Sequence, residues 1–411
     1  MIDDSQPLLK RTTWNQFSGA QLTFGPNAVK ALSGVMLRRK SQRVLVVSDR
    51  MLEEVGLVAH VVAAIKQTEA TATLFLDGEV EPSTATVASV VNSASEFQPD
   101  LFVALGGGSN MDLAKAAAAA FSHNCCAETL FGYDMVPGPI TPLVCLPTTA
   151  GTGSEVSHAA VIRNVETGKK ASILSQHIRP EVALVDPYLT LSCPAKVTAE
   201  SGMDALTHAI EAFLVKNFYL FDDDPQQGLA FEGNHPLGDM YAERAIRLIA
   251  LSLERATEDP LDLSARSSMA LAATLAGFAF ASCGVSLVHA LEYPIGSKYK
   301  CSHGIGNAIM LPAVMRFWID ERRGRIARIA DMLGVPKANT LPPAEAAEAA
   351  VAAVERLRRS VGLPTCLAEV GGTMDDIDEL AASAVSAQRL LNLSPVETTV
   401  DDAKFMLKAA L

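Results

Sequence analysis

Four side chains with metal-binding chemistry occur at spacings that would let them meet. Asp204 and His208 are four residues apart in a helix-like segment, so both would lie on one helix face. His289 directly follows a long uncharged segment, and His303 comes fourteen residues later. One carboxylate and three imidazoles suit Fe²⁺, Zn²⁺, Ni²⁺ or Co²⁺ better than Mg²⁺ or Ca²⁺. These residues predict a site for one divalent metal, although an isolated Asp/His pair is more often structural.

A glycine-rich turn is the first of two segments predicted to bind a cofactor. Gly106, Gly107, Gly108 and Ser109 follow a strand-like segment and open a helix that passes through Asp112. The glycines let the backbone approach a phosphate closely, and the first N–H groups of the helix point toward it. The turn lacks the Gly-x-Gly-x-x-Gly spacing of the dinucleotide fingerprint, so a tight turn without a ligand is the alternative.

The second segment, Pro147–Glu155, follows the next predicted strand. It combines two glycines with the hydroxyl groups of Thr148, Thr149, Thr152 and Ser154. Ligands of open α/β sheets bind at the carboxyl ends of strands, where this segment begins, so it is predicted to contact the same cofactor.

Asp49 ends the first predicted strand. A carboxylate there can accept hydrogen bonds from ribose hydroxyl groups and repel the 2′-phosphate of NADP, which favours NAD. The alternative role of Asp49 is to cap the following helix. Leu189 is also among the residues predicted to bind the cofactor.

The elements around these residues predict an α/β region followed by a helical one. Strand-like segments at 43–48, 71–76, 100–105 and 142–146 alternate with helix-like segments at 51–66, 84–96 and 110–122. This alternation predicts a mainly parallel sheet. After Pro194 the predicted elements are all helices, at 197–215, 239–256, 262–291, 304–318, 322–333, 343–361 and 375–390. We predict domains at 1–194 and 195–411, with an inserted segment at 217–238.

Composition excludes several classes of protein. The net charge of −12 over 411 residues argues against a nucleic-acid partner. Seven cysteines, with no Cys-x-x-Cys pair, and an N-terminus unlike a signal peptide favour a reducing cytoplasm. The uncharged stretch 267–288 is long enough to span a membrane, but its Ala, Gly and Ser content favours a buried core helix, so no membrane partner is expected.

Together the motifs resemble the iron-containing (group III) metal-dependent alcohol dehydrogenase family. The resemblance extends over nearly the whole chain, and its most specific motifs are Gly106–Asp112, Pro147–Glu155, Gly202–Glu211 and His289–His303. It implies a dehydroquinate synthase-like architecture, with an N-terminal α/β dinucleotide-binding domain, an all-α C-terminal domain and an active site in the cleft.

The resemblance also implies the roles of particular residues. It implies Asp204, His208, His289 and His303 as ligands of Fe²⁺, with Zn²⁺ or another divalent metal as the alternative. Further residues are implied beside a bound NAD, with NADP less favoured: Gly107, Gly108, Thr148, Thr149 and Lys170. A homodimer or higher homo-oligomer is expected.

Two features depart from the commoner family pattern. Many members carry another histidine four residues after the third ligand, where this chain has Tyr293, which we predict to be a catalytic-site residue. Tyrosine titrates near pH 10 and does not exchange protons at neutral pH as histidine does. Tyr293 and the insertion at 217–238 are similar to the branch that includes hydroxyacid–oxoacid transhydrogenase.

These observations predict a cytoplasmic, metal-dependent and NAD-linked dehydrogenase that transfers a hydride between an alcohol or hydroxy acid and nicotinamide. Its partners would be small alcohols, aldehydes or hydroxy acids. The alternatives are a transhydrogenase acting on 4-hydroxybutyrate-like substrates, a metal-free maleylacetate reductase-like enzyme, and a non-enzymatic, filament-forming scaffold.

Overall fold

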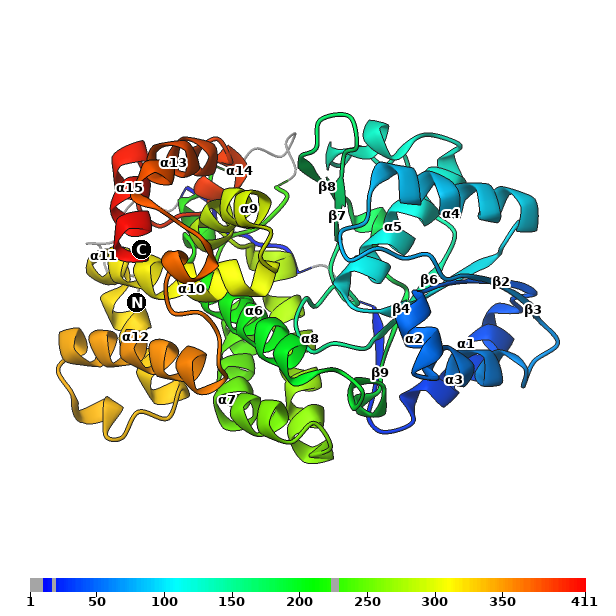
Figure 1. Cartoon of the computed structure of the whole chain (residues 1–411), viewed down its shortest axis with the longest axis horizontal. Coiled ribbons are helices and arrows are strands. Elements are labelled where there is room, and N and C mark those ends of the chain that lie inside the picture. The colour runs from blue at the N-terminus through cyan, green and yellow to red at the C-terminus, as the bar shows by residue number, and fades with distance from the viewer. Residues whose placement is uncertain (1–9, 17–19, 223–228) are drawn as a thin grey trace. The chain divides into compact units, whose positions relative to one another are not determined.

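A computed structural model describes residues 10–16, 20–222 and 229–411 (Figure 1). By their contacts these residues form two compact units. The α/β unit comprises residues 20–198 and 255–277, and the helical unit comprises residues 10–16, 199–222, 229–254 and 278–411. The predicted boundary near residue 194 lies close to the change between residues 198 and 199. Residues 10–16 were expected in the α/β domain but group with the helical unit. Residues 255–277 were expected in the helical domain but group with the α/β unit.

The α/β unit is built on a six-stranded sheet with the order β1–β9–β6–β4–β2–β3. All neighbouring strands are parallel, as the sequence predicted. The strands are β1 (Gln21–Phe24), β2 (Arg43–Val47), β3 (Thr71–Phe75), β4 (Leu101–Gly106), β6 (Leu143–Pro147) and β9 (Val182–Val185). The outer strand β1 and the four-residue β9 were not predicted, because each is too short to show a clear pattern.

Helices cover both faces of this sheet (Figure 1). Leu45 and Val47 of β2 face a core shared with α4 (Thr84–Phe97) and α5 (Gly108–His123). Val44 and Val46 face the opposite core, shared with α1 (Ala31–Arg39) and α3 (Leu57–Ile65). Burial on both faces explains why the central strands are continuous apolar runs rather than alternating ones.

The remaining elements of the α/β unit surround the sheet. They include α2 (Arg50–Glu54) and a second sheet of β5 (Gly132–Tyr133), β7 (Ala159–Arg163) and β8 (Lys170–Leu174). The predicted single helix at 51–66 is two helices, α2 and α3, because Gly56 adopts a positive φ of 83° between them.

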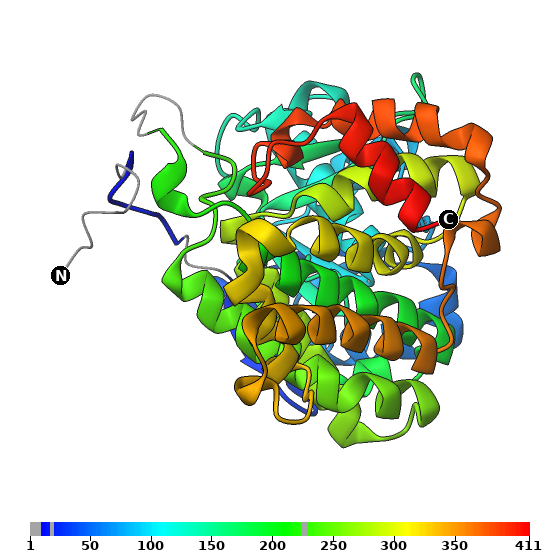
Figure 2. The ribbon, with the colours of Figure 1, turned by 90° about the vertical axis from the view of Figure 1, so that its left-hand side faces the viewer.

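The second half of the chain is helical, as predicted. Its helices are α6 (Ala195–Leu214), α7 (Pro236–Glu258), α8 (Leu263–Cys283), α9 (Leu287–Tyr299), α10 (His303–Phe317), α11 (Ile319–Met332), α12 (Pro343–Ser360), α13 (Ile377–Val385), α14 (Gln388–Leu391) and α15 (Val400–Ala409). The C-terminal α15, drawn in red in Figure 2, packs against α13 and α10.

The predicted helix at 262–291 is also two helices. Gly284 has a φ of 93°, and a Cβ there would lie 2.9 Å from the Phe231 side chain, so the chain turns between α8 and α9. The turn places His289 in the first helical turn of α9. Among the described residues α8 is the one helix long and apolar enough to cross a membrane, but 61% of its most apolar window is buried within the protein. Such burial is typical of a core helix.

The predicted insertion at 217–238 is anchored at its end. Residues 223–228 lie outside the described residues. His235 is buried and stacks on Trp14, with ring centroids 4.3 Å apart. Its Nε2 lies 2.9 Å from Ser282 Oγ, and its Nδ1 accepts a hydrogen bond from Gly238 N. This segment therefore connects the start of the chain with the end of α8.

Candidate metal centre

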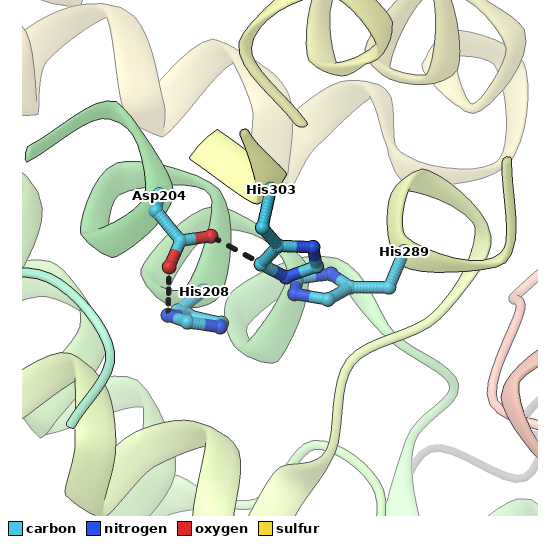
Figure 3. Close-up of side chains that lie close together, drawn as sticks. All are labelled: Asp204, His208, His289 and His303. Atoms are coloured by element: carbon cyan, nitrogen blue, oxygen red, sulfur yellow. Dashed lines mark ion pairs between the residues drawn. The ribbon is translucent and has the colours of Figure 1, made fainter. Parts of the chain in front are cut away.

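The four predicted metal ligands lie together in the helical unit (Figure 3). Asp204, His208, His289 and His303 each offer a ligand atom, and these atoms all lie within 4.8 Å of one another. Asp204 and His208 occupy successive turns of α6, His289 comes from α9, and His303 is the first residue of α10. The first three are buried, whereas His303 is partly exposed. The prediction that these side chains meet thus agrees with the geometry.

Two buried glutamates orient two of the imidazoles. Glu211 lies 2.5 Å from Nδ1 of His289 and also accepts a hydrogen bond from Val288 N. Glu292 lies 2.5 Å from Nδ1 of His303. When Nδ1–H donates to a carboxylate, the lone pair of the ring remains on Nε2, which is the arrangement that metal-binding histidines usually adopt. Both Nε2 atoms therefore offer lone pairs to the cluster.

Glycines make room for Glu292. A Cβ on Gly296 of α9 would lie 2.5 Å from Glu292 Oε1, and one on Gly306 of α10 would lie 2.7 Å from its Cγ. A Cβ on Gly304 would lie 2.2 Å from the carbonyl oxygen of Glu200 on α6. The glycines around His303 therefore allow α10 to approach α6 and α9 closely enough to complete the cluster.

Burial and mutual charge set the protonation of the cluster. Burial lowers the pKa of His208 to about 4 and that of His289 to about 3, which keeps both imidazoles neutral. Burial alone would raise the pKa of Asp204, but the three neighbouring histidines outweigh it and the pKa is lowered. Burial raises the pKa of Glu211 to about 8, so a nearby cation would favour its ionised form. Neutral imidazoles and an ionised carboxylate are what a divalent metal requires.

A bound cation would satisfy the polar atoms of this cluster better than their contacts with one another do. His208 Nδ1 and Asn307 Oδ1 are buried without hydrogen-bond partners among the described residues. A buried polar atom without a partner is costly in a native protein. Three nitrogens and one carboxylate also form the donor set that suits a transition metal such as Fe²⁺ or Zn²⁺.

Tyr293 lies beside the cluster. Its ring centroid is 6.2 Å from that of His303, and burial raises its pKa to about 12, so the hydroxyl group stays neutral. Arg389 on α14 is the cation that opposes this rise. Two nearby lysines have other partners. Lys298, five residues after Tyr293, binds Asp376 at 2.8 Å, and Lys216, just before the insertion, lies over the ring of Phe221.

In the α/β unit, the glycine turn and the hydroxyl-rich loop lie against each other. Thr148 N donates to Gly106 O at 3.0 Å. A Cβ on Gly107 would lie 3.4 Å from Thr149 Oγ1, and one on Gly108 would lie 2.6 Å from Thr152 Cγ2. A Cβ at Gly107 would make only an ordinary contact, whereas Gly108 is needed for the loop to pack on the turn.

The other predicted cofactor residues have protein partners. Asp49 caps α2 by accepting from Leu52 N at 2.9 Å, and Asn110 Nδ2 donates to its second oxygen at 2.7 Å. Ser109 Oγ donates to the carbonyl oxygen of Val80, and Ser154 Oγ donates to Asp112 at 2.6 Å. Lys170 pairs with Glu81 at 2.7 Å, and Leu189 packs in the core between the sheet and α1 and α3. Cofactor contact by these residues stays a prediction.

Sequence reasoning missed several residues that organise both regions. Lys115 is fully buried and donates to Ser154 Oγ at 2.8 Å and to Ala159 O at 2.9 Å, which fixes the loop between β6 and β7. Glu292 and Asn307 were also missed. Their signal is their spacing, three residues after His289 and four after His303, and a polar residue at such a spacing shares the helix face of the ligand.

Comparison with known proteins identifies the family. Residues 19–187 match the sequence profile of iron-containing alcohol dehydrogenase, and residues 228–411 match the C-terminal profile of the Fe-containing alcohol dehydrogenase family. The chain is 33% identical over 397 residues to the NAD-dependent methanol dehydrogenase of Bacillus methanolicus, covering 97% of this chain and 100% of that protein. It is 30% identical over 433 residues to the mitochondrial hydroxyacid-oxoacid transhydrogenase of Xenopus laevis, covering 98% and 92%.

A solved structure of a 1,3-propanediol oxidoreductase shares the fold, with a TM-score of 0.91, 30% identity, and coverage of 97% of this chain and 100% of that one. These matches confirm the resemblance found in the sequence and the predicted architecture. The chain is therefore an oxidoreductase that belongs to the iron-containing alcohol dehydrogenase family.

Proposed function

We propose that this protein is a metal-dependent, NAD-linked alcohol dehydrogenase that interconverts small alcohols or hydroxy acids with their carbonyl compounds. The observation that carries the proposal is the cluster of Asp204, His208, His289 and His303, in which buried glutamates direct two imidazoles. A metal-free, maleylacetate reductase-like activity would leave this donor set without a purpose. We also propose a cytoplasmic homo-oligomer, with neither nucleic acid nor membrane as a partner.

The residues of the helical unit would hold the metal and orient the substrate. A divalent ion such as Fe²⁺ would supply the Lewis acidity that polarises the substrate oxygen during hydride transfer. Glu211 and Glu292 would keep His289 and His303 in the tautomer that presents Nε2. Tyr293 would donate or accept one hydrogen bond without carrying charge at neutral pH.

The α/β unit supplies the proposed cofactor site. The N–H groups at the start of α5, reached through Gly106–Gly108, suit a pyrophosphate. The negative charge of Asp49 would disfavour NADP, and the relative from Bacillus methanolicus is named as NAD-dependent. Thr148, Thr149 and Thr152 lie against the same turn and would complete the site.

The deciding experiment is a substrate panel assayed with purified protein loaded anaerobically with Fe²⁺. Simple alcohols, diols and hydroxy acids of matched length are supplied with NAD⁺ or NADP⁺. We expect NAD⁺-linked turnover that a chelator abolishes and Fe²⁺ restores. Turnover that survives complete removal of metal would exclude the proposed mechanism. A protein with neither nicotinamide-linked turnover nor bound metal would support the scaffold alternative.

One observation favours a transhydrogenase as the second candidate. Tyr293, beside the candidate ligand His303, resembles the branch that includes hydroxyacid-oxoacid transhydrogenase, and the chain is 30% identical to the member from Xenopus laevis. The assay is 4-hydroxybutyrate with 2-oxoglutarate and a trace of NAD⁺. Product formed in many-fold excess over the cofactor would support this activity, and product limited to the amount of NAD⁺ would exclude it.

Variants at Tyr293 link this candidate to the site. Tyr293→Phe removes the hydroxyl group, and Tyr293→His restores the side chain of the commoner family pattern. We expect both to lower kcat/KM for hydroxy acids more than for plain alcohols. Tyr293→His should add a limb to the pH profile below pH 6.5, because burial lowers the pKa of the neighbouring histidines. Unchanged profiles and substrate ranking in both variants would show that Tyr293 only packs.

A further inference from the structure

Asn110 is a buried residue of α5 to which the sequence motifs assign no role. It is the third residue of that helix, directly after the glycine turn, and only 3% of it is exposed. Its amide nitrogen donates to Asp49 Oδ2 at 2.7 Å and to the carbonyl oxygen of Leu105 at 3.2 Å. An amide NH₂ group has two hydrogens, so these two acceptors use both of them. The side chain therefore connects the start of α5 with Asp49.

The contacts of Asn110 lie at the carboxyl ends of three neighbouring strands. Asp49 follows β2, Gly78 comes shortly after β3, and Leu105 belongs to β4. In the sheet, β2 lies between β4 and β3, and ligands of open α/β sheets bind at this edge. A Cβ on Gly78 would lie 2.2 Å from Asn110 Oδ1, and one on Gly106 would lie 2.3 Å from Asn110 Nδ2. Neither glycine could carry a side chain while the amide stays in this place.

Asp49 is the residue whose charge is proposed to favour NAD over NADP, and two donors fix its carboxylate. Leu52 N donates to Oδ1 at 2.9 Å, and Asn110 Nδ2 donates to Oδ2. The terminal torsion of an aspartate is broad, so hydrogen bonds to both oxygens remove a freedom that the side chain otherwise has. Leu52 donates from the backbone and Asn110 from a side chain. A substitution can therefore remove the second bond and leave the first.

We propose that Asn110 is a specificity-determining residue for the cofactor, which acts by holding the carboxylate of Asp49 in place. The inference rests on the proposed NAD-linked function and deepens it. A negative charge that is held in place repels a 2′-phosphate more strongly than one that can move away from it. Each carboxylate oxygen has two lone pairs, so Asp49 can still accept hydrogen bonds from ribose hydroxyl groups while it is bound to Leu52 and Asn110.

Arg50 is the nearby cation that could oppose this preference. It follows Asp49 directly, and an arginine in this region of a dinucleotide-binding unit can accommodate a 2′-phosphate. The guanidinium group of Arg50 is exposed and lies 3.1 Å from Asp77 Oδ1. The pair of Arg50 and Asp77 carries no net positive charge. The selection against a 2′-phosphate is therefore expected to follow Asp49 and the residue that holds it.

Cofactor binding by a set of variants tests the inference without measuring turnover. Dissociation constants for NAD⁺ and for NADP⁺ are measured by calorimetry for the wild type, Asn110→Leu, Asp49→Asn and the double variant. Leucine has nearly the shape of asparagine but no donor. The double variant shows whether Asn110 acts through Asp49, because the effects of residues that act as a unit are not additive. Asn234→Leu is the matched control, since Asn234 is also buried and donates to an aspartate, Asp239, in the helical unit.

We expect Asn110→Leu to weaken NAD⁺ binding by roughly tenfold and NADP⁺ binding by much less, so that the ratio of the two dissociation constants narrows by roughly threefold or more. In the Asp49→Asn background, the same substitution should leave the ratio unchanged. Asn234→Leu should keep the wild-type ratio. If Asn110→Leu does not fold, Asn110→Ala decides in its place, because it removes the amide and adds no bulk.

Three results would overturn the inference while leaving the cofactor site intact. The first is wild-type binding of both cofactors by Asn110→Leu. The second is an equal loss for NAD⁺ and NADP⁺, which would show that Asn110 only packs the strand ends. The third is a narrowed ratio that Asn110→Leu produces equally in the Asp49→Asn background, because Asn110 would then act without Asp49. A wild-type protein that binds neither cofactor would instead refute the proposed function itself.

Discussion

Each unit contains a buried polar site: Lys115 in the α/β unit and the cluster around Asp204 in the helical unit. The two sites differ in whether hydrogen-bond donors or acceptors are in excess. Lys115 Nζ is a cation that donates to the oxygens of Ser154, Ser157 and Ala159. Around Asp204, the carboxylate and the imidazole nitrogens of His289 and His303 converge on the amide of Asn307. The first site carries its own positive charge, whereas the second is rich in lone pairs.

This difference separates a structural polar site from a binding site. Burying a charge requires partners, and the oxygens around Lys115 meet that requirement from within the protein. A group of buried acceptors without a matching protein cation is stabilised by a ligand that brings positive charge. The balance of buried donors and acceptors therefore identifies the metal centre more sharply than residue type does.

The largest effect is expected when a candidate metal ligand is removed from the acceptor-rich cluster around Asp204. His289→Ala deletes one imidazole and leaves Glu211 without that partner. We expect metal affinity to fall by more than roughly 100-fold, beyond the effect of changing a residue that only supports a ligand, and activity to fall with it. Metal analysis of the purified variant checks this, and the exposed His60→Ala is the control. Full metal occupancy in His289→Ala would remove His289 from the ligand set.

Lys115→Met tests the other side of the comparison. Methionine fills the space but leaves Asp112 without the nearby positive charge and the loop oxygens without their donor. We expect a loss of about 3 kcal/mol in the free energy of unfolding and weaker NAD⁺ binding, with metal content unchanged. Urea unfolding and fluorescence titration with NAD⁺ measure these effects, with the exposed Lys169→Met as the control. A loss of metal in Lys115→Met would show that the two polar sites are not independent.

The sequence predicted the four candidate metal ligands and the secondary structure around them. It did not predict which distant residues contact one another in the fold. The βαβ alternation predicts the parallel sheet, and the spacing of Asp204 and His208 predicts a shared helix face. The contact between Glu211 and His289 joins residues 78 positions apart, and local periodicity carries no information about such pairs. The break at Gly284 was missed because an apolar sequence continues through it. A Cβ there would clash with Leu393 and Phe231, which pack against Gly284 from elsewhere in the chain.

A smaller effect on the free energy of unfolding is expected from His235, a buried side chain that is not surrounded by an excess of hydrogen-bond acceptors. Burial lowers its pKa to about 4, compared with about 6.5 in an unfolded chain, so folding favours the neutral ring. Its contribution is therefore fully present above pH 6.5 and is lost as the pH falls toward 4. Between pH 7 and pH 5 this amounts to about 2 kcal/mol in the free energy of unfolding.

His235→Phe isolates this contribution, because phenylalanine can still stack on Trp14 but does not titrate. The free energy of unfolding is measured at both pH values for the metal-free wild type and variant. His208 and His289 titrate in both proteins, so the difference between their pH dependences reports His235. Equal pH dependence in wild type and variant would mean that His235 is not held neutral by burial.

The smallest effect on the free energy of unfolding is expected at Asp49. Both of its carboxylate oxygens already accept hydrogen bonds from the protein, from Leu52 N and Asn110 Nδ2. Asparagine caps a helix about as well as aspartate does, so Asp49→Asn should change the free energy of unfolding by less than about 0.5 kcal/mol. The substitution also removes the negative charge, which is what would repel a 2′-phosphate.

The loss of this charge should change the choice of cofactor. At a few ångströms near a protein surface such repulsion is worth about 1 to 3 kcal/mol, so the preference for NAD⁺ over NADP⁺ should narrow by roughly tenfold or more. The ratio of kcat/KM for the two cofactors measures this, and Glu53→Gln, one turn away on the exposed side of α2, is the matched charge control. An unchanged ratio in Asp49→Asn would leave Asp49 as a helix cap alone, satisfied by protein donors in the same way as the oxygens around Lys115.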